Sequence, residues 1–260
     1  MRPPSLRAAR HHGAVDVRAP EPGAVDVGAP APGDATATPS PLRATVLRDG
    51  WTVAGALLSD EDIDALRAGF DAVVDDAVRT ARYPSREACL RLVQLWHDPW
   101  RVSPAYAALL GHPALLALAR EVLGCEDVRL LSQRLIVKPP DGRTPLPWHQ
   151  DFPHSPLAEP HGALFWIALD DVDGTTGGLR YLPGTHLGAE PSIDIEAVGA
   201  VVPAGHVLVH HPLVWHAASS NRSGRWRRAC LVTVADARTP SRAGAWDPAQ
   251  FPLLPWAPGG

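Results

Sequence analysis

The sequence from about residue 128 onward is built of short runs of apolar and β-branched residues that proline and glycine interrupt. Runs of this length between turn-forming residues are typical of β-strands. We expect strands over residues 128–138, 147–151, 162–169, 178–182, 199–202, 206–210 and 228–235. No helical pattern separates them, which argues against a parallel α/β sheet and favours a sandwich or barrel. We predict a jelly-roll, because its narrow interior brings residues of distant strands to one point.

The first half of the folded region shows helical periodicity instead. Ser59 and Asp62 form a capping box, and apolar residues follow it at three- and four-residue spacing. A second helix is expected from about Pro113 to Leu123, where Gly124 ends it. The expected fold class is therefore mainly β with flanking helices around a double-stranded β-helix (jelly-roll, cupin-like) core.

Composition divides the chain into three parts. Residues 1–43 are rich in Pro, Ala and Gly and contain the segment Gly-Ala-Val-Asp-Val twice, so we expect a disordered tail that buries too little apolar surface to fold. Residues 44–240 form the single domain, in which order begins near Val46 with a turn and a short strand over residues 47–53. Residues 241–260 are a Pro-rich C-terminal extension.

Charge and cysteine content exclude several classes of protein. A net charge of −4 gives no basic surface for nucleic acid or an anionic membrane. No apolar run approaches the roughly 18 residues of a membrane span, and the N-terminus lacks the apolar segment of a secretory signal. Three cysteines without a CxxC pattern are typical of a reduced protein. We therefore expect a cytoplasmic protein; its oligomeric state is not readable from the sequence.

A His-x-Asp pair and a later histidine carry the most specific chemistry. His149 and Asp151 are two residues apart on the strand expected at residues 147–151, so strand alternation directs both side chains to one face. His216 follows the strand at residues 206–210 and can reach the same point in a jelly-roll. Two histidines and one carboxylate are the ligand set of non-haem Fe(II) oxygenases, which leave the opposite face of the metal open for a co-substrate and O₂.

The pair alone is weak evidence, since a chain of this composition contains about one His-x-acid pair by chance. Polar loop residues with no shared ion are the alternative. Arg227, eleven residues after His216, begins the last expected strand, and its guanidinium matches a carboxylate of a dianionic co-substrate. It also belongs to an arginine-rich run, so a solvated basic turn is a second alternative. Only one of Arg227 and Arg228 can face inward.

In their order and spacing these motifs resemble the phytanoyl-CoA dioxygenase family of Fe(II)- and 2-oxoglutarate-dependent oxygenases. The resemblance covers about residues 46–236. It rests on Lys138-Pro-Pro-Asp141, Trp148-His-Gln-Asp151, Leu182-Pro-Gly-Thr-His186, His216 followed by Asn221, and Arg227-Arg228-Ala229. It implies that residues 44–240 form an Fe(II)/2-oxoglutarate dioxygenase domain.

The resemblance also implies roles for six residues. The iron ligands would be His149, Asp151 and His216. The residues that contact 2-oxoglutarate would be Arg227, which binds the distal carboxylate, Trp166, which lines the pocket, and Gln133, which makes a polar contact.

Two positions bear on the chemistry that the resemblance implies. Family members often carry a serine two residues after the distal histidine, whereas Ala218 occupies that position here. Related halogenases replace the carboxylate ligand by a small residue, so the presence of Asp151 favours hydroxylation, although desaturation and cyclisation use the same ligands.

The function implied is hydroxylation of an unactivated C–H bond in a small organic substrate, with Fe(II), 2-oxoglutarate and O₂, and with release of succinate and CO₂. A bacterial specialised-metabolite intermediate is the first candidate substrate. The alternatives are a non-catalytic jelly-roll that binds a ligand and a cupin-like protein that uses another metal.

Overall fold

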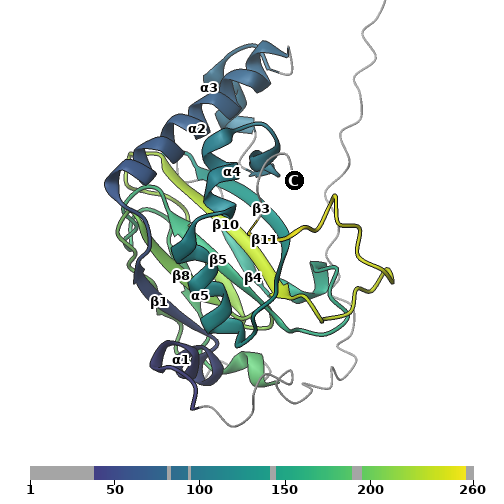
Figure 1. The fold of residues 1–260 in the computed structure, drawn as a ribbon. Helices are drawn as coiled ribbons and strands as arrows, with labels where there is room; N and C mark the ends of the chain where they lie inside the picture. The colour runs from purple at the N-terminus through teal and green to yellow at the C-terminus, as the bar shows by residue number, and fades with distance from the viewer. Residues whose placement is uncertain (1–37, 81–82, 93–94, 141–144, 189–194, 256–260) are drawn as a thin grey trace, which may run out of the picture.

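The computed structural model describes residues 38–80, 83–92, 95–140, 145–188 and 195–255. Most of the N-terminal tail expected at residues 1–43 lies outside the described residues, as does Asp141 of the Lys-Pro-Pro-Asp motif. The described chain forms two antiparallel sheets, and helices cover the outer face of the larger one (Figure 1). The expected fold class, mainly β with flanking helices, is confirmed.

The larger sheet has seven strands within the described residues, and every pairing in it is antiparallel. In spatial order the strands are β1 (Trp51–Ala56), β8 (His206–His210), β5 (Gly162–Ala168), β10 (Arg227–Asp236), β3 (Val128–Lys138) and β11 (Leu253–Leu254), and β2 (Leu95–His97) also pairs with β3. Strands far apart in the sequence are therefore neighbours, as a jelly-roll requires.

The smaller sheet carries the metal-ligand candidates. Its strands, in spatial order, are β4 (Leu146–His149), β9 (His216–Ala218), β6 (Leu179–Tyr181) and β7 (Val198–Gly199). These strands are two to four residues long, so their positions depend on packing against the larger sheet more than on their own hydrogen bonds.

Strand β5 shows how the larger sheet is buried on both faces. Every residue of β5 is buried, and successive side chains enter different clusters. Phe165 and Ile167 pack into the core shared with the helices, while Leu164 and Trp166 face the interior between the two sheets. A strand covered on both sides reads as a continuous apolar run, which explains why the sequence pattern predicted it so well.

The helices form a third layer on the outer face of the larger sheet (Figure 1). They are α1 (Pro41–Asp49), α2 (Asp60–Arg79), α3 (Arg86–Leu92), α4 (Pro104–Leu110) and α5 (Pro113–Leu123), with the short 3₁₀ turn η1 (Pro99–Arg101) before α4. Two further 3₁₀ turns, η2 (Phe152–His154) and η3 (Thr185–Leu187), follow β4 and β6 in the chain. None of the helices in the described part of the chain is long and apolar enough to cross a membrane.

Both helices expected from the sequence are confirmed. Ser59 caps α2 and forms the capping box with Asp62. Helix α5 runs from Pro113 to Leu123 and ends at Gly124, whose φ of 66° is the left-handed conformation that glycine adopts without strain. Buried residues of α2 recur at the expected helical spacing and pack on the larger sheet.

The strand expected over residues 47–53 is wrong for its first residues. A helix, α1, occupies Pro41–Asp49, and the strand begins only at Trp51. Ser40 accepts a hydrogen bond from the Arg43 backbone N–H and Pro41 occupies the first turn, so the helix starts inside the segment assigned to the tail. Only one residue of this short helix is buried, and a helix with so little apolar periodicity gives no clear sequence signal.

The described part of the C-terminal extension packs against the larger sheet. Strand β11 pairs with the beginning of β3, and the Arg129 guanidinium donates to the Phe251 carbonyl oxygen at 2.8 Å. Trp246 and Phe251 contact each other edge to face at 5.0 Å and pack against a small apolar cluster. Residues 241–255 therefore cover one edge of the sheet.

Candidate metal and co-substrate site

His149 and His216 lie opposite each other on adjacent strands of the smaller sheet. Strand β4 ends at His149, β9 begins at His216, and the two residues are direct partners in the antiparallel register. Their ring centroids are 4.1 Å apart. The two imidazoles are distant in the sequence and lie close together because β4 and β9 are adjacent strands.

Asp151 reaches the same point from a turn. The backbone of Asp151 is helical, with φ −81° and ψ −28°, and η2 follows it immediately. The backbone N–H groups of Asp151 and Phe152 both donate to the Pro212 carbonyl oxygen at 3.0 Å, which fixes the turn against the loop before β9. The expectation that residues 147–151 form one strand was therefore wrong beyond His149, and strand alternation is not what brings the carboxylate to the histidine.

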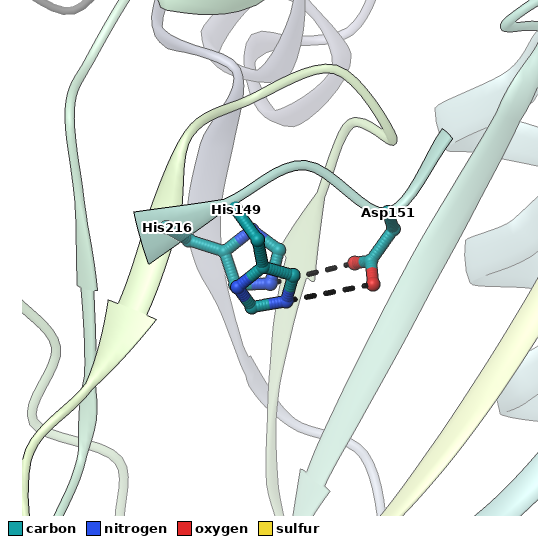
Figure 2. Close-up of side chains that lie close together, drawn as sticks. All are labelled: His149, Asp151 and His216. Carbon is teal, nitrogen blue, oxygen red and sulfur yellow. Dashed lines mark ion pairs between the residues drawn. The ribbon is translucent and has the colours of Figure 1, made fainter. Parts of the chain in front are cut away.

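The three side chains converge closely enough to share one ion. Figure 2 shows both imidazoles turned toward the Asp151 carboxylate. The His149 Nε2 to Asp151 Oδ1 distance is 3.8 Å and the His216 Nε2 to Asp151 Oδ2 distance is 3.4 Å. One ligand atom from each of the three residues lies within 4.8 Å of the others. Metal bonds of about 2.1 Å hold neighbouring ligand atoms about 3 Å apart, so small side-chain movements suffice for binding.

Backbone carbonyl groups fix which nitrogen of each imidazole is available. His149 Nδ1 lies 2.9 Å from the Pro147 carbonyl oxygen, and His216 Nδ1 lies 3.1 Å from that of Val214. A carbonyl oxygen only accepts hydrogen bonds, so Nδ1 carries the proton in both rings and Nε2 keeps its lone pair. A metal-binding histidine needs this tautomer.

The electrostatics of the site favour the charge states that a metal needs. Burial opposes the charge of Asp151, but the hydrogen bond with His210 and the surrounding imidazoles outweigh it and hold the pKa of Asp151 well below its usual value. Burial lowers the pKa of His216 to about 3, with His210 adding to the shift. At neutral pH the site therefore offers a carboxylate and a neutral imidazole.

A third histidine, His210 at the end of β8, joins the cluster and was not assigned a role from the sequence. His210 Nε2 lies 3.0 Å from Asp151 Oδ2, and Nδ1 lies 2.8 Å from the Tyr181 hydroxyl. Tyr181 in turn stacks on Trp51, with ring centroids 4.5 Å apart. The sequence placed His210 only at the end of a strand. That position does not show that the imidazole faces the Asp151 carboxylate.

Arg227 enters the interior from the first position of β10. The residue is 2% exposed, and its Nη2 donates to the Gly177 carbonyl oxygen at 3.1 Å, while Nε and Nη1 have no hydrogen-bond partner among the described residues. Burial lowers its pKa to about 10. The guanidinium lies 5.2 Å from the Trp166 ring centroid. Trp166 itself is 3% exposed and faces the same interior.

Arg228 faces the opposite side of the sheet. Its Nε and Nη2 donate to the two oxygens of Asp170 at 2.9 and 2.7 Å, and its guanidinium lies 5.7 Å from the ring of Phe70 on α2. Of the two adjacent arginines, Arg227 is thus the one that points between the sheets.

Gln133 does not make the contact expected of it. In the register of the sheet it is paired with Val232, which packs into the helix-side core. Its Nε2 donates to the Tyr106 carbonyl oxygen on α4 at 2.9 Å. The side chain therefore points away from the metal-ligand candidates. The residue that faces the interior next to it is Arg134, which is paired with Leu231 of the inner cluster. The buried Nε of Arg134 has no hydrogen-bond partner in the described part of the chain.

The family of this chain is identified by comparison with known proteins. A family model described as phytanoyl-CoA dioxygenase (PhyH) matches residues 46–229. An L-proline trans-4-hydroxylase of Streptomyces griseoviridis is 26% identical over 224 residues, which cover 72% of this chain and 82% of that protein. An ectoine dioxygenase of Nocardia farcinica is 30% identical over 168 residues, 63% of this chain and 54% of that protein. The chain thus spans about half the length of that ectoine dioxygenase.

Solved structures confirm the jelly-roll core. The α-ketoglutarate-dependent carbocyclase SnoK from nogalamycin biosynthesis superposes with a TM-score of 0.67 at 23% identity, over 84% of this chain and 99% of that one. The epimerase SnoN, solved in complex with Fe³⁺, α-ketoglutarate and nogalamycin RO, gives a TM-score of 0.66 at 21% identity, over 82% of this chain and 97% of that one.

Proposed function

The chain belongs to the phytanoyl-CoA dioxygenase family, and we propose that it hydroxylates an unactivated C–H bond of a small organic molecule with Fe(II), 2-oxoglutarate and O₂. One atom of O₂ enters the substrate as a hydroxyl group, the other enters succinate, and CO₂ is released. The observation that carries the proposal is the convergence of His149, Asp151 and His216, beside an interior to which Arg227 offers two nitrogens that have no partner among the described residues.

The donor set fits Fe(II). Nε2 of His149, Nε2 of His216 and one Asp151 oxygen would hold the ion on one face and leave the opposite positions open. Two neutral imidazoles and one carboxylate offset a single charge of Fe(II), which favours a dianionic co-substrate. Bound Fe(II) would supply the activation of O₂ and the oxidative decarboxylation of 2-oxoglutarate.

Arg227 supports the choice of a dicarboxylate as co-substrate. Its Nε and Nη1 are donors without a partner among the described residues, and a guanidinium forms strong charge-assisted hydrogen bonds with a carboxylate. The ring of Trp166, 5.2 Å from the guanidinium, would form one apolar wall for the carbon chain. A monocarboxylic 2-oxo acid would leave these donors unpaired, which costs binding free energy.

Buried apolar side chains line the interior next to these groups. The inner faces of the two sheets contribute buried side chains to one cluster, which includes Leu164, Leu179, Leu208, Val214 and Leu231. Exclusion of water strengthens the charge interactions in the site and protects a reactive oxidant from side reactions.

The names of two relatives indicate a candidate substrate class. Relatives named for their substrates act on proline and ectoine, so a small organic molecule is the first candidate, and a specialised-metabolite intermediate belongs to this class. We assign the activity to the domain at residues 44–240. The three cysteines are unpaired in the structure, in keeping with a reducing compartment such as the cytoplasm.

The test is succinate formation by protein purified without oxygen and then given Fe(II), 2-oxoglutarate and O₂. We expect slow substrate-independent succinate release by the wild type and none by Asp151→Ala. Asp64→Ala is the matched control, because Asp64 lies on the exposed side of α2 with a side chain that is 76% exposed. It should behave as the wild type.

Binding separates the proposal from its alternatives. Fe(II) and 2-oxoglutarate together should give a weak visible charge-transfer band without O₂. Absence of both the band and succinate would overturn the proposal and favour a non-catalytic or other-metal jelly-roll. A band without succinate would mean that turnover requires the substrate, and candidate substrates would then be added.

A further inference from the structure

The inner face of the larger sheet becomes more exposed from β8 toward β2. One row of side chains on this face crosses five strands and consists of Leu208, Trp166, Leu231, Arg134 and His97, each paired with the next in the register. The first three are 0%, 3% and 6% exposed. Arg134 is half-buried and His97 is exposed. The interior is therefore closed at β8 and opens at β3.

The neighbouring row connects the metal-ligand candidates with the same open side. It consists of His210, Leu164, Thr233 and Ser132. At one end His210 contacts the Asp151 carboxylate, and at the other end Ser132 is partly exposed. Neighbouring strands lie about 4.8 Å apart, so the steps from β8 through β5 and β10 to β3 span about 14 Å. A small organic molecule and the side chains at its two ends fill such a distance.

The order of the strands places β3 beyond the edge of the smaller sheet. Trp51 of β1 stacks on Tyr181 of β6, and His210 of β8 contacts Asp151 just after β4. β4 is the edge strand of the smaller sheet, whereas β5, β10 and β3 continue the larger sheet past β8. The partial exposure of Arg134 agrees with this arrangement. The side of the interior next to β3 thus gives a ligand access to the metal-ligand candidates.

Arg134 brings a charge to this open side without a counter-ion among the described residues. Its Nε is buried and has no hydrogen-bond partner there. Its neighbours on the same face are Leu231 directly opposite and Ser132 and Ile136 on β3, none of which is acidic. A partly buried guanidinium beside apolar side chains has lost part of its hydration, which a bound anion would replace.

A pair of hydroxyl groups lies beside Arg134 on the same face. Ser132 Oγ donates to Thr233 Oγ1 at 3.2 Å. Since Thr233 accepts in this pair, its own proton can be donated to a further acceptor. A guanidinium next to a hydroxyl donor suits the oxygens of a carboxylate.

The cations at the other end of the interior are separate from Arg134. Arg227 and its register partner Lys138 are both buried, and they lie four residues along their strands from Leu231 and Arg134. Four residues of a strand span about 13 Å. The interior therefore has separate positions for two anionic groups, one at Arg227 and one at Arg134.

We propose that Arg134 binds a carboxylate group of the primary substrate and thereby selects small carboxylic acids. The inference rests on the proposed function and names a substrate class for it. The carboxylate would lie at β3, and the carbon skeleton would extend across the sheet toward His210 and Asp151, where the C–H bond is oxidised. Arg134 is thus a specificity-determining residue and not a ligand of the metal or the co-substrate.

The experiment compares carboxylic acids with amides of the same shape. We would add butanoate, cyclopentanecarboxylate or 3-phenylpropanoate, or the amide of each, to protein saturated with Fe(II) and 2-oxoglutarate without O₂. The melting temperature as a function of ligand concentration gives the affinity. We expect at least one acid to bind about tenfold or more tightly than its amide, because a charge-assisted hydrogen bond contributes about 1.5 kcal/mol or more.

Variants of Arg134 assign this preference to the guanidinium. Arg134→Gln should reduce the preference for the acid to less than about twofold. Arg134→Lys keeps the charge but loses the planar fork, so it should bind the acid several-fold more weakly than the wild type and still prefer it to the amide. Arg225→Gln, in the exposed loop before β10, controls for the change in net charge and should keep the full preference.

Two further measurements separate the primary substrate from the co-substrate. The visible charge-transfer band of Fe(II) and 2-oxoglutarate should persist when the acid is added. Loss of the band would mean that the acid displaces 2-oxoglutarate, and it would overturn the proposal. The affinity of Arg134→Gln for 2-oxoglutarate should stay within about twofold of the wild type, whereas a loss of about tenfold would place Arg134 in the co-substrate site.

Failure of this inference differs from failure of the proposed function. If the wild type with Fe(II) binds no 2-oxoglutarate, the proposed function fails. If the wild type binds 2-oxoglutarate but prefers none of the acids to its amide, or if Arg134→Gln keeps the preference, the role of Arg134 is overturned while the proposed function stands. Should Arg134→Gln not fold, Arg134→Lys decides, since an affinity for the acid equal to that of the wild type would overturn the role of the guanidinium.

Discussion

Two adjacent arginines on opposite faces of strand β10 differ in their hydrogen-bond partners. On the helix side, Arg228 makes side-chain and backbone hydrogen bonds to the Asp170 carboxylate, and these raise the pKa of Arg228. On the inner side and within the described residues, Arg227 donates to one carbonyl group, and its Nε and Nη1 have no partner; burial lowers its pKa. The two residues are of the same type and adjacent in the sequence, so their different pKa shifts come from their different surroundings.

The difference indicates that the inner face of the larger sheet, rather than its helix-covered face, is suited to bind a ligand. A buried charge that is matched within the protein, such as Arg228, connects the sheet to the segment after β5 and serves stability. A buried charge without a match destabilises the free protein and is retained where a ligand completes it. The substitutions below test this comparison, from the largest expected effect to the smallest.

Replacement of Arg227 by methionine should weaken 2-oxoglutarate binding about 100-fold, because two charge-assisted hydrogen bonds are lost. The ligand-free protein should melt at the same or a higher temperature, since removal of a buried charge without a counter-ion among the described residues offsets the loss of the hydrogen bond to the Gly177 carbonyl oxygen. Titration of the visible band without O₂ measures the first effect and thermal unfolding the second. A dissociation constant within threefold of the wild type would contradict the role of Arg227.

Replacement of Arg228 by methionine should give the opposite pattern. The free energy of unfolding should fall by about 2 kcal/mol, less than for a fully buried pair because both side chains are about one-fifth exposed. Urea denaturation measures this loss. Binding of 2-oxoglutarate to the folded fraction should stay within about twofold of the wild type. Weaker binding without lower stability would show that the two faces are not independent.

Replacement of His210 by phenylalanine should weaken Fe(II) binding about tenfold, because partners that orient a metal ligand typically contribute this much. The structural reason is the 3.0 Å contact between His210 Nε2 and the Asp151 carboxylate. Equilibrium dialysis against Fe(II) without O₂ measures the change. Tyr181→Phe removes only the hydroxyl group behind the imidazole and should have a smaller effect; an equal or larger effect would place the important contact at the tyrosine.

The pH dependence of 2-oxoglutarate binding should report on Lys138. Its pKa is lowered to about 7, and the groups that face it are Arg227 from β10 and the Ser219 carbonyl from the loop after β9. As pH rises from 7 to 9 the free lysine loses its charge while Arg227 keeps its own, so the dissociation constant should rise up to about tenfold. The same rise should be absent in Lys138→Met.

The stability of the ligand-free protein should rise with pH over the range in which 2-oxoglutarate binding becomes weaker. The pKa of Lys138 is lower in the folded protein than the ordinary 10.5, so folding disfavours the charged form. The ligand-free protein should therefore gain stability from this group as pH rises from 7 toward 10.5. Urea denaturation at several pH values, for the wild type and Lys138→Met, isolates this contribution; parallel curves would contradict it.

Long elements with one clear environment were predictable from the sequence. Helix α2 carries a capping box and a regular apolar face, and β5 is buried on both faces. Short elements were not predictable, because contacts with distant parts of the chain determine where they form. Helix α1 has one buried residue, and β9 has three residues and depends on β4 and β6 for its position.

The ligand candidates could be identified from residue type and order, but their geometry could not. His149 and Asp151 meet through a turn that the Pro212 carbonyl oxygen fixes, and a contact so distant in the sequence leaves no local pattern. The error for Gln133 has a simple cause. Side chains alternate along β3, so an assignment displaced by one residue falls on the wrong face, where Gln133 binds Tyr106 of α4.

Strand β10 lies between β5 and β3 near the centre of the larger sheet, and yet it follows both of these strands in the chain. Until it emerges, β3 and β5 lack the neighbour that joins them, and the apolar faces of α2 and α5 have only an incomplete sheet to cover. Unpaired strand edges and uncovered helices are the features that lead nascent chains to aggregate. We therefore expect the larger sheet to form only after β10 has been synthesised, and chains truncated before Arg227 to be bound by chaperones or degraded.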